Sequence, residues 1–329
     1  HELRDGDSKY QGKGVEQALN NIETYIKAEL VGQDCSNQEL IDNKLIDLDG
    51  TENKKKLGAN SMLAVSLANI RAYSSLVGKD LFEVIPEVYG EPKLPIPLMN
   101  ILNGGAHADN NIDIQEFMIV PHGFSSFSDS LRAGVEIYHV LKDKLKKDKM
   151  STNVGDEGGF APNLESSQVA LDIIVDAISI AGYKPGQEVS LALDVASSEF
   201  YKDGKYIVEG SELNSEEMSS FLAGLVDKYP IVSVEDGMAE NDWDGWKSLT
   251  EILGSKIQLV GDDLFVTNAN ILGKGIDKRC ANSILIKLNQ VGTFTETINT
   301  LNLAKENEYT SVISHRSGET EDTFISHLA

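Results

Sequence analysis

The 329-residue sequence has few cysteines, little basic charge and no long hydrophobic run. Its two cysteines, Cys35 and Cys280, lack CxxC spacing, which excludes a disulfide framework and indicates a reduced cytoplasmic compartment. Lysine and arginine total 29 against 52 acids, a formal net charge of −23. Because nucleic-acid backbones are bound by basic surfaces, this charge argues against direct nucleic-acid binding. The excess of acids suits either plain solubility or the collection of cations.

No apolar stretch approaches the roughly 20 residues that span a bilayer, so no membrane span is predicted, and no signal peptide opens the chain. The sequence starts at His1 inside a charged segment and ends in Phe324–Ala329, which is typical of a helix in progress. We therefore expect both ends to be truncated. An apolar fraction of 41% is ordinary for a globular enzyme, and the length is sufficient for a large core.

The first 83 residues predict three helices without obvious chemistry. Apolar residues at spacings of three and four predict a helix over 14–30. Ser36, with Glu39 as a capping box, predicts a second helix that ends near Leu48. A third is expected over 62–76. We assign residues 1–83 to a mainly helical remnant of an N-terminal α+β domain.

Residues 84–329 predict an α/β fold. Strands over 94–102 and 114–120 are too close for a crossover helix, so they form an antiparallel hairpin that opens a ββαα unit with helices over 126–147 and 165–181. Beyond it, apolar runs end near residues 195, 235, 262, 288 and 315, and helices are expected over 215–228, 242–253, 268–275 and 293–306. This alternation predicts a TIM-like β/α barrel, incomplete at its C-terminal end, with its chemistry at the strand ends.

Three successive apolar runs end in acids, namely Asp194, Glu235 and Asp262. Because barrel strands end on one face, their carboxylates are expected to converge. Three unneutralised carboxylates at close range repel one another, and a divalent cation removes the repulsion. An all-oxygen ligand set suits Mg²⁺ rather than zinc. The alternative is that each acid caps a helix or pairs with a base.

Lys287 lies near the end of the run Ser283–Gln290, which predicts a buried strand. Beside a cation and partly desolvated, its ammonium would lose a proton readily and act as a general base. A salt bridge with Asp262 or Asp263 is the structural alternative. Glu116 and Glu157 are expected across the barrel mouth, where a carboxylic acid would protonate a leaving hydroxyl; either is alternatively an ordinary surface acid.

Two further groups of side chains are candidates for ligand contacts. His107 follows a Gly-Gly turn and is either a polar ligand contact or a satisfied loop histidine. His315, Arg316 and Ser317 combine an imidazole, a guanidinium and a hydroxyl group, which together suit a phosphate.

Eight motifs, in order, resemble the enolase family along essentially the whole chain. They are Asn103-Gly-Gly-Ala-His-Ala108, Gln115-Glu-Phe-Met118, Gly155-Asp-Glu-Gly-Gly-Phe-Ala-Pro162, Leu193-Asp-Val-Ala-Ser-Ser-Glu199, Ser233-Val-Glu-Asp236, Val260-Gly-Asp-Asp263, Leu285-Ile-Lys-Leu-Asn-Gln290 and Ser314-His-Arg-Ser-Gly-Glu-Thr-Glu-Asp322. Glu235-Asp236-Gly237 is more similar to bacterial enolases, since eukaryotic members usually have proline third.

The resemblance implies glycolytic, reversible dehydration of 2-phosphoglycerate to phosphoenolpyruvate. It implies that Lys287 removes the C2 proton and that Glu157 helps the C3 hydroxyl to leave. The other implied roles are Mg²⁺ ligation by Asp194, Glu235 and Asp262, assistance by Glu116, substrate contact by Gln115, His107, Asp262 and Lys287, phosphate contact by Arg316 and Ser317, and a neighbouring role for His315. A lysine or histidine base with an Mg²⁺-stabilised ene-diolate is a known property of the superfamily and not a deduction from this sequence.

The sequence departs from the family at its two ends. The family's N-terminal strand meander, a loop serine for the second Mg²⁺ and a second site lysine do not lie in this chain. Ligands for only one of two expected Mg²⁺ sites are thus fully present, and we expect the chain alone to be weakly active or inactive.

The resemblance also implies a homodimer or larger homo-oligomer such as an octamer. It implies a cytoplasmic protein, with a secondary cell-surface or secreted pool that needs no signal peptide. Two alternatives stay open. One is another superfamily acid dehydratase that acts on a non-phosphorylated acid. The other is a secondary binding role as a surface or RNA-processing-complex partner.

Overall fold

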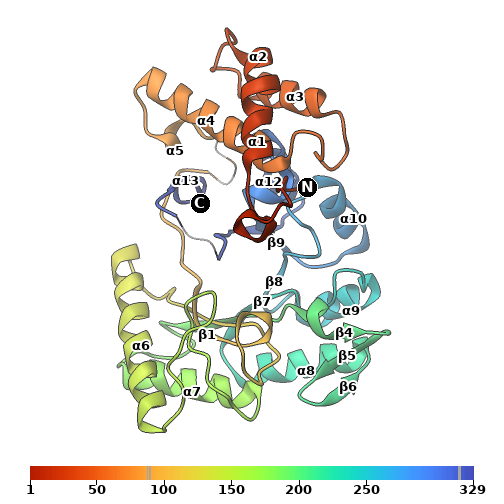
Figure 1. Ribbon diagram of the computed structural model, residues 1–329. Coiled ribbons are helices and arrows are strands. Elements are labelled where there is room, and N and C mark those ends of the chain that lie inside the picture. Colours follow the sequence, from red (N-terminus) through yellow and green to blue (C-terminus); the bar gives the residue numbers. More distant parts are fainter. Residues whose placement is uncertain (87, 89, 318–319) are drawn as a thin grey trace. The chain divides into compact units, whose positions relative to one another are not determined.

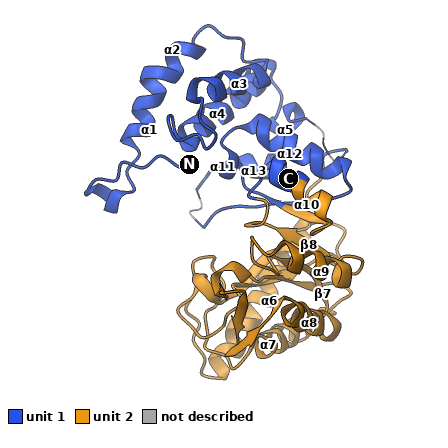
Figure 2. Cartoon of the chain, turned by 90° about the vertical axis from the view of Figure 1, so that its right-hand side faces the viewer, with its two compact units in different colours: residues 1–92, 266–273, 285–329 blue, residues 93–265, 274–284 orange. Residues whose placement is uncertain are grey.

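The computed structural model describes residues 1–86, 88, 90–317 and 320–329 (Figure 1). These residues form two compact units (Figure 2). Unit 1 contains His1–Pro92, Val266–Gly273 and Leu285–Ala329, and unit 2 contains Lys93–Phe265 and Lys274–Ile284. The predicted domain limits, 1–83 and 84–329, divide the sequence by fold and stay a prediction. No helix in the described part of the chain is both long and apolar enough to cross a bilayer.

The N-terminal segment of unit 1 is helical, in the red and orange part of Figure 1. Its apolar core contains Ile26, Leu45, Leu57 and Met62. The helical elements are η1 (Lys9–Gly12), α1 (Glu16–Asn21), the π-helical turn η2 (Ile22–Ile26), α2 (Lys27–Leu30), α3 (Gln38–Asp49), α4 (Ala59–Val77) and α5 (Leu81–Val84). The helix predicted over 14–30 is therefore present, as α1, η2 and α2 in succession.

The N-cap of α3 is Asn37, not the predicted Ser36. The Asn37 side chain accepts a hydrogen bond from the Leu40 N–H at 3.0 Å. Ser36 lies one residue earlier, in a turn where its own N–H donates to the Asp34 carboxylate at 2.9 Å. The cap therefore moves by one residue because Asp34 already fixes the backbone at Ser36.

The later segments of unit 1 pack against its N-terminal helices. They form α11 (Leu288–Val291), α12 (Phe294–Glu306), β10 (Thr310–Ile313) and α13 (Phe324–Leu328). Buried Asp42 of α3 accepts hydrogen bonds from the Thr295 N–H at 2.9 Å and from its hydroxyl at 2.6 Å. The Ser66 hydroxyl accepts from the Phe294 N–H at 2.9 Å, so α3 and α4 together satisfy the first turn of α12.

Unit 2 is built on a sheet that begins antiparallel and continues parallel. β1 (Met99–Asn103) pairs with β2 (Glu116–Val120) and β2 with β3 (Ser190–Asp194), both antiparallel, as the sequence predicted for the first pair. Parallel pairing then joins β3 to β7 (Ile231–Glu235), β7 to β8 (Gln258–Gly261) and β8 to the first half of β9 (Ser283–Ile286). All five residues of β3 are buried, as expected of a strand covered on both faces.

Helices follow the strands of unit 2 as predicted. They are α6 (Phe127–Lys147), α7 (Ser167–Ile180), α8 (Ser215–Lys228) and α9 (Trp243–Leu253), and α10 (Ala269–Lys278) runs from unit 1 into unit 2. Short 3₁₀ turns lie at η3 (Gly105–His107) and η4 (Ser197–Phe200). The sequence analysis missed a small antiparallel sheet of β4 (Tyr201–Lys202), β5 (Lys205–Val208) and β6 (Ser211–Leu213).

The strand predicted over Ser283–Gln290 is shorter than expected. β9 ends at Ile286, and Leu288–Val291 form the helical turn α11. The Lys287 N–H donates to the Thr267 hydroxyl at 2.9 Å, and the Lys287 carbonyl accepts from the Gln290 N–H at 2.9 Å. Both main-chain groups of Lys287 are therefore used outside a strand ladder, which ends the strand before this residue.

Candidate active site

A row of acids crosses the ends of three neighbouring strands in unit 2. Glu116 of β2 is the register partner of Asp194 of β3, and Asp194 is in turn the partner of Glu235 of β7. Asp262 follows β8 directly, beside β7. The predicted acids at residues 194, 235 and 262 thus belong to adjacent strand ends, where like charges on neighbouring strands destabilise the sheet unless something neutralises them.

The electrostatics of these acids are those of a crowded, buried negative cluster. Asp194 and Asp262 are each 7% exposed, and Asp236 is 3% exposed. Burial and the neighbouring charges of Glu116 and Asp262 raise the pKa of Asp194 to about 7. Burial and the charges of Asp262, Asp194 and Asp263 raise the pKa of Asp236 well above its usual range. Such a cluster is stabilised by any cation that it binds.

Oxygen donors lie close enough together to fit a hard cation. Carboxylate oxygens of Asp236, Asp262 and Asp263 all lie within 4.8 Å of one another. Gln115 Nε2 donates to Asp194 Oδ2 at 2.8 Å, and the Ala196 N–H donates to Asp194 Oδ1 at 3.1 Å, so the Asp194 carboxylate is held in one orientation. An all-oxygen donor set of this kind fits Mg²⁺.

Asp236 and Asp263 were not among the predicted site residues. Each is the second acid of a doubled pair, Glu235-Asp236 and Asp262-Asp263, at the end of a strand. The doubling was the available signal, but only the first member of each pair was assigned to the metal. The predicted ligand set stays a prediction, with Asp262 common to both groups.

Three predicted residues meet in a second group. Ligand atoms of His107, Glu116 and Glu157, all half-buried, lie within 4.8 Å of one another. His107 Nδ1 lies 3.1 Å from Glu116 Oε1. The adjacent Glu116 carboxylate raises the pKa of His107, and burial opposes this increase. A carboxylate beside an imidazole in this way forms a pair that can hold or release a proton.

The loop that carries Glu157 is fixed to the His107 turn by its backbone. The Asp156 N–H donates to the His107 carbonyl at 3.0 Å, and the Gly155 N–H donates to the Gly159 carbonyl at 2.8 Å. A Cβ at Gly155 would lie 2.4 Å from the His107 carbonyl oxygen. Only glycine allows this close approach, so the predicted acid and His107 are brought together by a glycine-dependent contact.

The remaining predicted residues lie in unit 1. Lys287 is half-buried after β9, whereas His315, Arg316 and Ser317 are exposed after β10. Arg316 Nη1 donates to Asn289 Oδ1 at 3.0 Å, so this guanidinium is oriented by the turn that follows Lys287. Residues 318–319 of the predicted motif 314–322 lie outside the described residues.

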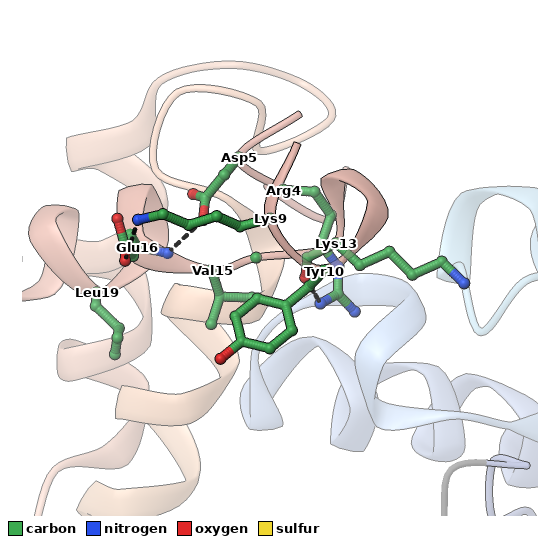
Figure 3. A pocket seen from close by; sticks show the side chains of 9 residues that line it. Arg4, Asp5, Lys9, Tyr10, Lys13, Val15, Glu16 and Leu19 are labelled. Atoms are coloured by element: carbon green, nitrogen blue, oxygen red, sulfur yellow. Dashed lines mark hydrogen bonds and ion pairs between the residues drawn. The ribbon is translucent and has the colours of Figure 1, made fainter. Parts of the chain in front are cut away.

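A hollow of about 210 Å³ in unit 1 contains none of the predicted site residues (Figure 3). Two of its three cations make side-chain contacts within this segment: Lys9 lies 3.5 Å from Glu16, and Arg4 donates to the Lys13 carbonyl at 2.7 Å. Asp5 accepts from the N–H groups of Glu16 and Gln17, both at 2.9 Å. These contacts hold the N-terminal segment against the start of α1, and they include none of the predicted catalytic or metal-binding residues.

Nearly the whole sequence matches two protein-family models. Residues 1–85 match the description "Enolase, N-terminal domain", and residues 91–329 match "Enolase, C-terminal TIM barrel domain". The second match confirms the predicted α/β fold class and its barrel type.

Proposed function

The chain belongs to the enolase family, and on that premise we propose that it catalyses the Mg²⁺-dependent, reversible dehydration of 2-phosphoglycerate to phosphoenolpyruvate in glycolysis. The observation that carries the proposal is the row of Glu116, Asp194 and Glu235 in register. The group of His107, Glu116 and Glu157 shares one member with this row. Glu116 of the proton-handling group is therefore the register partner of Asp194, a proposed cation ligand, so the two kinds of chemistry that an elimination next to a carboxylate uses lie on adjacent strands.

In this proposal, Asp194, Glu235 and Asp262 hold the cation. A bound Mg²⁺ would supply positive charge to stabilise the negative charge that develops on the substrate carboxylate. Gln115 orients the Asp194 carboxylate through its 2.8 Å hydrogen bond. Arg316 and Ser317 supply the guanidinium and hydroxyl donors for the phosphate.

Two residues move protons in the proposed reaction. Lys287 accepts the proton from C2, and the electron pair of that C–H bond forms the C2–C3 double bond. Glu157 donates a proton to the C3 hydroxyl, which leaves as water when the C–O bond breaks. A ring nitrogen of His107, which is paired with Glu116, lies within 4.8 Å of a Glu157 carboxylate oxygen. His107 is therefore a second proton-carrying group beside Glu157.

The direct test is formation of phosphoenolpyruvate from 2-phosphoglycerate by the full-length protein, followed by ultraviolet absorbance. We expect turnover with Mg²⁺ and its loss on chelation. Absence of turnover with saturating Mg²⁺ would contradict the proposal. Turnover of non-phosphorylated 2-hydroxy acids at a comparable rate would favour a different superfamily dehydratase.

The role of Lys287 is tested by Lys287→Ala in the full-length protein. Removal of a general base should slow exchange of the C2 proton by about 10²- to 10⁴-fold, while Mg²⁺ binding persists. Exchange is followed by NMR in heavy water. Lys305→Ala, an exposed lysine of α12, is the control and should leave exchange unchanged. Retained exchange in Lys287→Ala would assign the base to another group.

The same proposal includes a cytoplasmic homo-oligomer, either a dimer or a larger assembly such as an octamer. Family membership supports this part of the proposal, which concerns the full-length protein. Sedimentation velocity over a range of protein concentrations measures the assembly. A monomer throughout that range would contradict it.

A further inference from the structure

The carboxylate of Asp236 holds the backbone on which Asp262 is placed. Asp236 follows β7 directly. Its Oδ1 accepts a hydrogen bond from the Asp262 N–H at 3.0 Å, and its Oδ2 accepts from the Asp263 N–H at 2.8 Å. Each oxygen of the Asp236 carboxylate accepts from one of two consecutive N–H groups. The peptide planes on either side of Asp262 are therefore fixed by one side chain.

The main chain of Asp236 holds the two neighbouring strand ends in the same way. Its carbonyl accepts from the N–H of Ser197 at 3.1 Å and from the Ser197 hydroxyl at 2.7 Å, in the turn that follows Asp194. Its N–H donates to the Val260 carbonyl of β8 at 2.9 Å. All three proposed metal ligands are thus tied to this residue: Asp194 through Ser197, Glu235 as its chain neighbour, and Asp262 through the carboxylate.

The backbone of Asp236 is held in an uncommon conformation. Its φ is 42°, in the left-handed region that aspartate enters more readily than most residues. At the next residue, Gly237, a Cβ would lie 2.8 Å from Leu249 Cδ2 of α9. The chain therefore turns tightly after β7 and is pressed against the helix, which aims the Asp236 carboxylate back toward the end of β8.

From these contacts we propose that Asp236 is the positioning residue that sets the spacing of the metal ligands at the ends of β3, β7 and β8. This inference rests on the proposed function, because it assumes that Asp194, Glu235 and Asp262 hold a cation. Asp236 acts through the backbone of Asp262 and the turn at Ser197. It contacts neither substrate nor metal in this role.

The test compares Asp236→Asn with Asp263→Asn in the full-length protein. Both changes replace one carboxyl group of the same cluster by an amide. In Asp236→Asn, however, one carboxylate oxygen is replaced by an NH₂ donor, which cannot accept from a backbone N–H. Asp263→Asn leaves both of the Asp236 acceptors in place. Mn²⁺ binding is followed by electron paramagnetic resonance, and amide exchange over residues 258–265 is measured by mass spectrometry without metal.

We expect Asp236→Asn to weaken Mn²⁺ binding by about 10- to 100-fold, the usual effect of removing a group that orients metal ligands. Amide exchange at residues 262–263 should become faster in the metal-free protein. Asp263→Asn should change Mn²⁺ binding less and leave that exchange unchanged. Equal losses of Mn²⁺ affinity in the two variants, with unchanged exchange in both, would show an effect of charge alone and overturn the proposal. Weakened binding with unchanged exchange in Asp236→Asn would make Asp236 itself a ligand and overturn it as well.

Two further measurements keep the inference testable. If Asp236→Asn does not fold, the second variant is Ser197→Ala, which removes the hydroxyl contact to the Asp236 carbonyl and keeps every charge. We expect Ser197→Ala to bind Mn²⁺ more weakly. Unchanged Mn²⁺ binding would contradict the positioning role of Asp236. A wild-type protein that binds no Mn²⁺ would contradict the proposed function instead. In that case, exchange at residues 262–263 of Asp236→Asn still decides whether Asp236 holds this backbone.

Discussion

Two buried aspartates, one in each unit, have pKa values shifted in opposite directions. Asp49, the last residue of α3, is 2% exposed, and Asp194, the last residue of β3, is 7% exposed. Burial alone would raise the pKa of both. Around Asp49, hydrogen bonds from the Thr51 hydroxyl and the Leu57 N–H outweigh burial, and the pKa is lowered. Around Asp194, burial and nearby carboxylates raise the pKa to about 7.

The difference lies in what surrounds each carboxylate. The N–H groups of Thr51 and Leu57 donate to Asp49 at 3.0 Å and 2.7 Å, and the Thr51 hydroxyl donates to it as well. These bonds fasten the turn after α3 to the helix. Asp194 also accepts two hydrogen bonds, from Gln115 and Ala196, but it has acids as neighbours, Glu116 among them. A buried acid that is surrounded by hydrogen-bond donors stabilises the folded state, whereas a buried acid among other acids is suited to binding a cation.

The largest effect is expected from Asp49→Ala. This change leaves the buried Leu57 N–H without its acceptor, and we expect the free energy of unfolding to fall by about 2–4 kcal/mol. Urea denaturation measures it. The control is Asp47→Ala, an exposed acid two residues earlier, which should change stability by no more than about 0.5 kcal/mol. Equal losses of unfolding free energy in the two variants would show that Asp49 stabilises the fold no more than an exposed acid does.

Asp194→Asn is expected to change the free energy of unfolding less, and to raise it rather than lower it. Loss of one charge relieves repulsion in the cluster, so the metal-free protein should gain about 1 kcal/mol of stability. The same change should abolish stabilisation by Mg²⁺, which thermal unfolding with and without a chelator measures. Asp203→Asn, at an exposed turn of the small sheet, is the control and should keep the Mg²⁺ effect. A destabilised metal-free Asp194→Asn would show that repulsion is not the dominant force.

The pH dependence of stability separates the two aspartates directly. The folded pKa of Asp194, about 7, exceeds its ordinary value of 3.8. Its contribution to the stability of the metal-free protein is therefore fully present below 3.8 and is lost as pH rises through about 7. Asp49 has a lowered pKa, so its contribution is present above 3.8 and is lost as pH falls through its folded value.

Local amide exchange distinguishes these two responses. Corrected for its intrinsic pH dependence, exchange in β3 should become faster between pH 4 and 8, while exchange at 49–57 should stay constant. Saturating Mg²⁺ should remove the change in β3. A parallel response of both segments would contradict the comparison.

The helices could be predicted closely because their signals are local. α8, α9 and α12 begin after Asn214, Asp242 and Thr293, whose side chains accept from the N–H three residues on. The small sheet was missed although Asp203-Gly204, both with positive φ, is a strong hairpin signal. Its strands are two to four residues long, too short for an alternating pattern to be recognised.

The site was predictable only as far as strand ends could be read from the sequence. Apolar runs ending in acids located Asp194, Glu235 and Asp262. The hydrogen bond from the Asp262 N–H to the Asp236 carboxylate joins residues 26 apart and depends on the register of β7 and β8. The end of β9 likewise depends on Thr267, which is 20 residues before Lys287. Contacts of this kind are set by tertiary structure and leave no periodic pattern.

The composition of unit 1 from distant segments has a consequence for synthesis on the ribosome. The hydrogen bond between Phe294 and Ser66 joins residues 228 apart, and the hydrogen bond between Thr295 and Asp42 joins residues 253 apart. At typical elongation rates, about 10 to 50 s pass between emergence of the N-terminal helices and of α12. Throughout that interval, Asp42 of α3 and Ser66 of α4 lack the hydrogen-bond donors that α12 supplies. The N-terminal helices can form their own apolar core early, whereas these two buried polar groups find their native partners only when α12 has been synthesised.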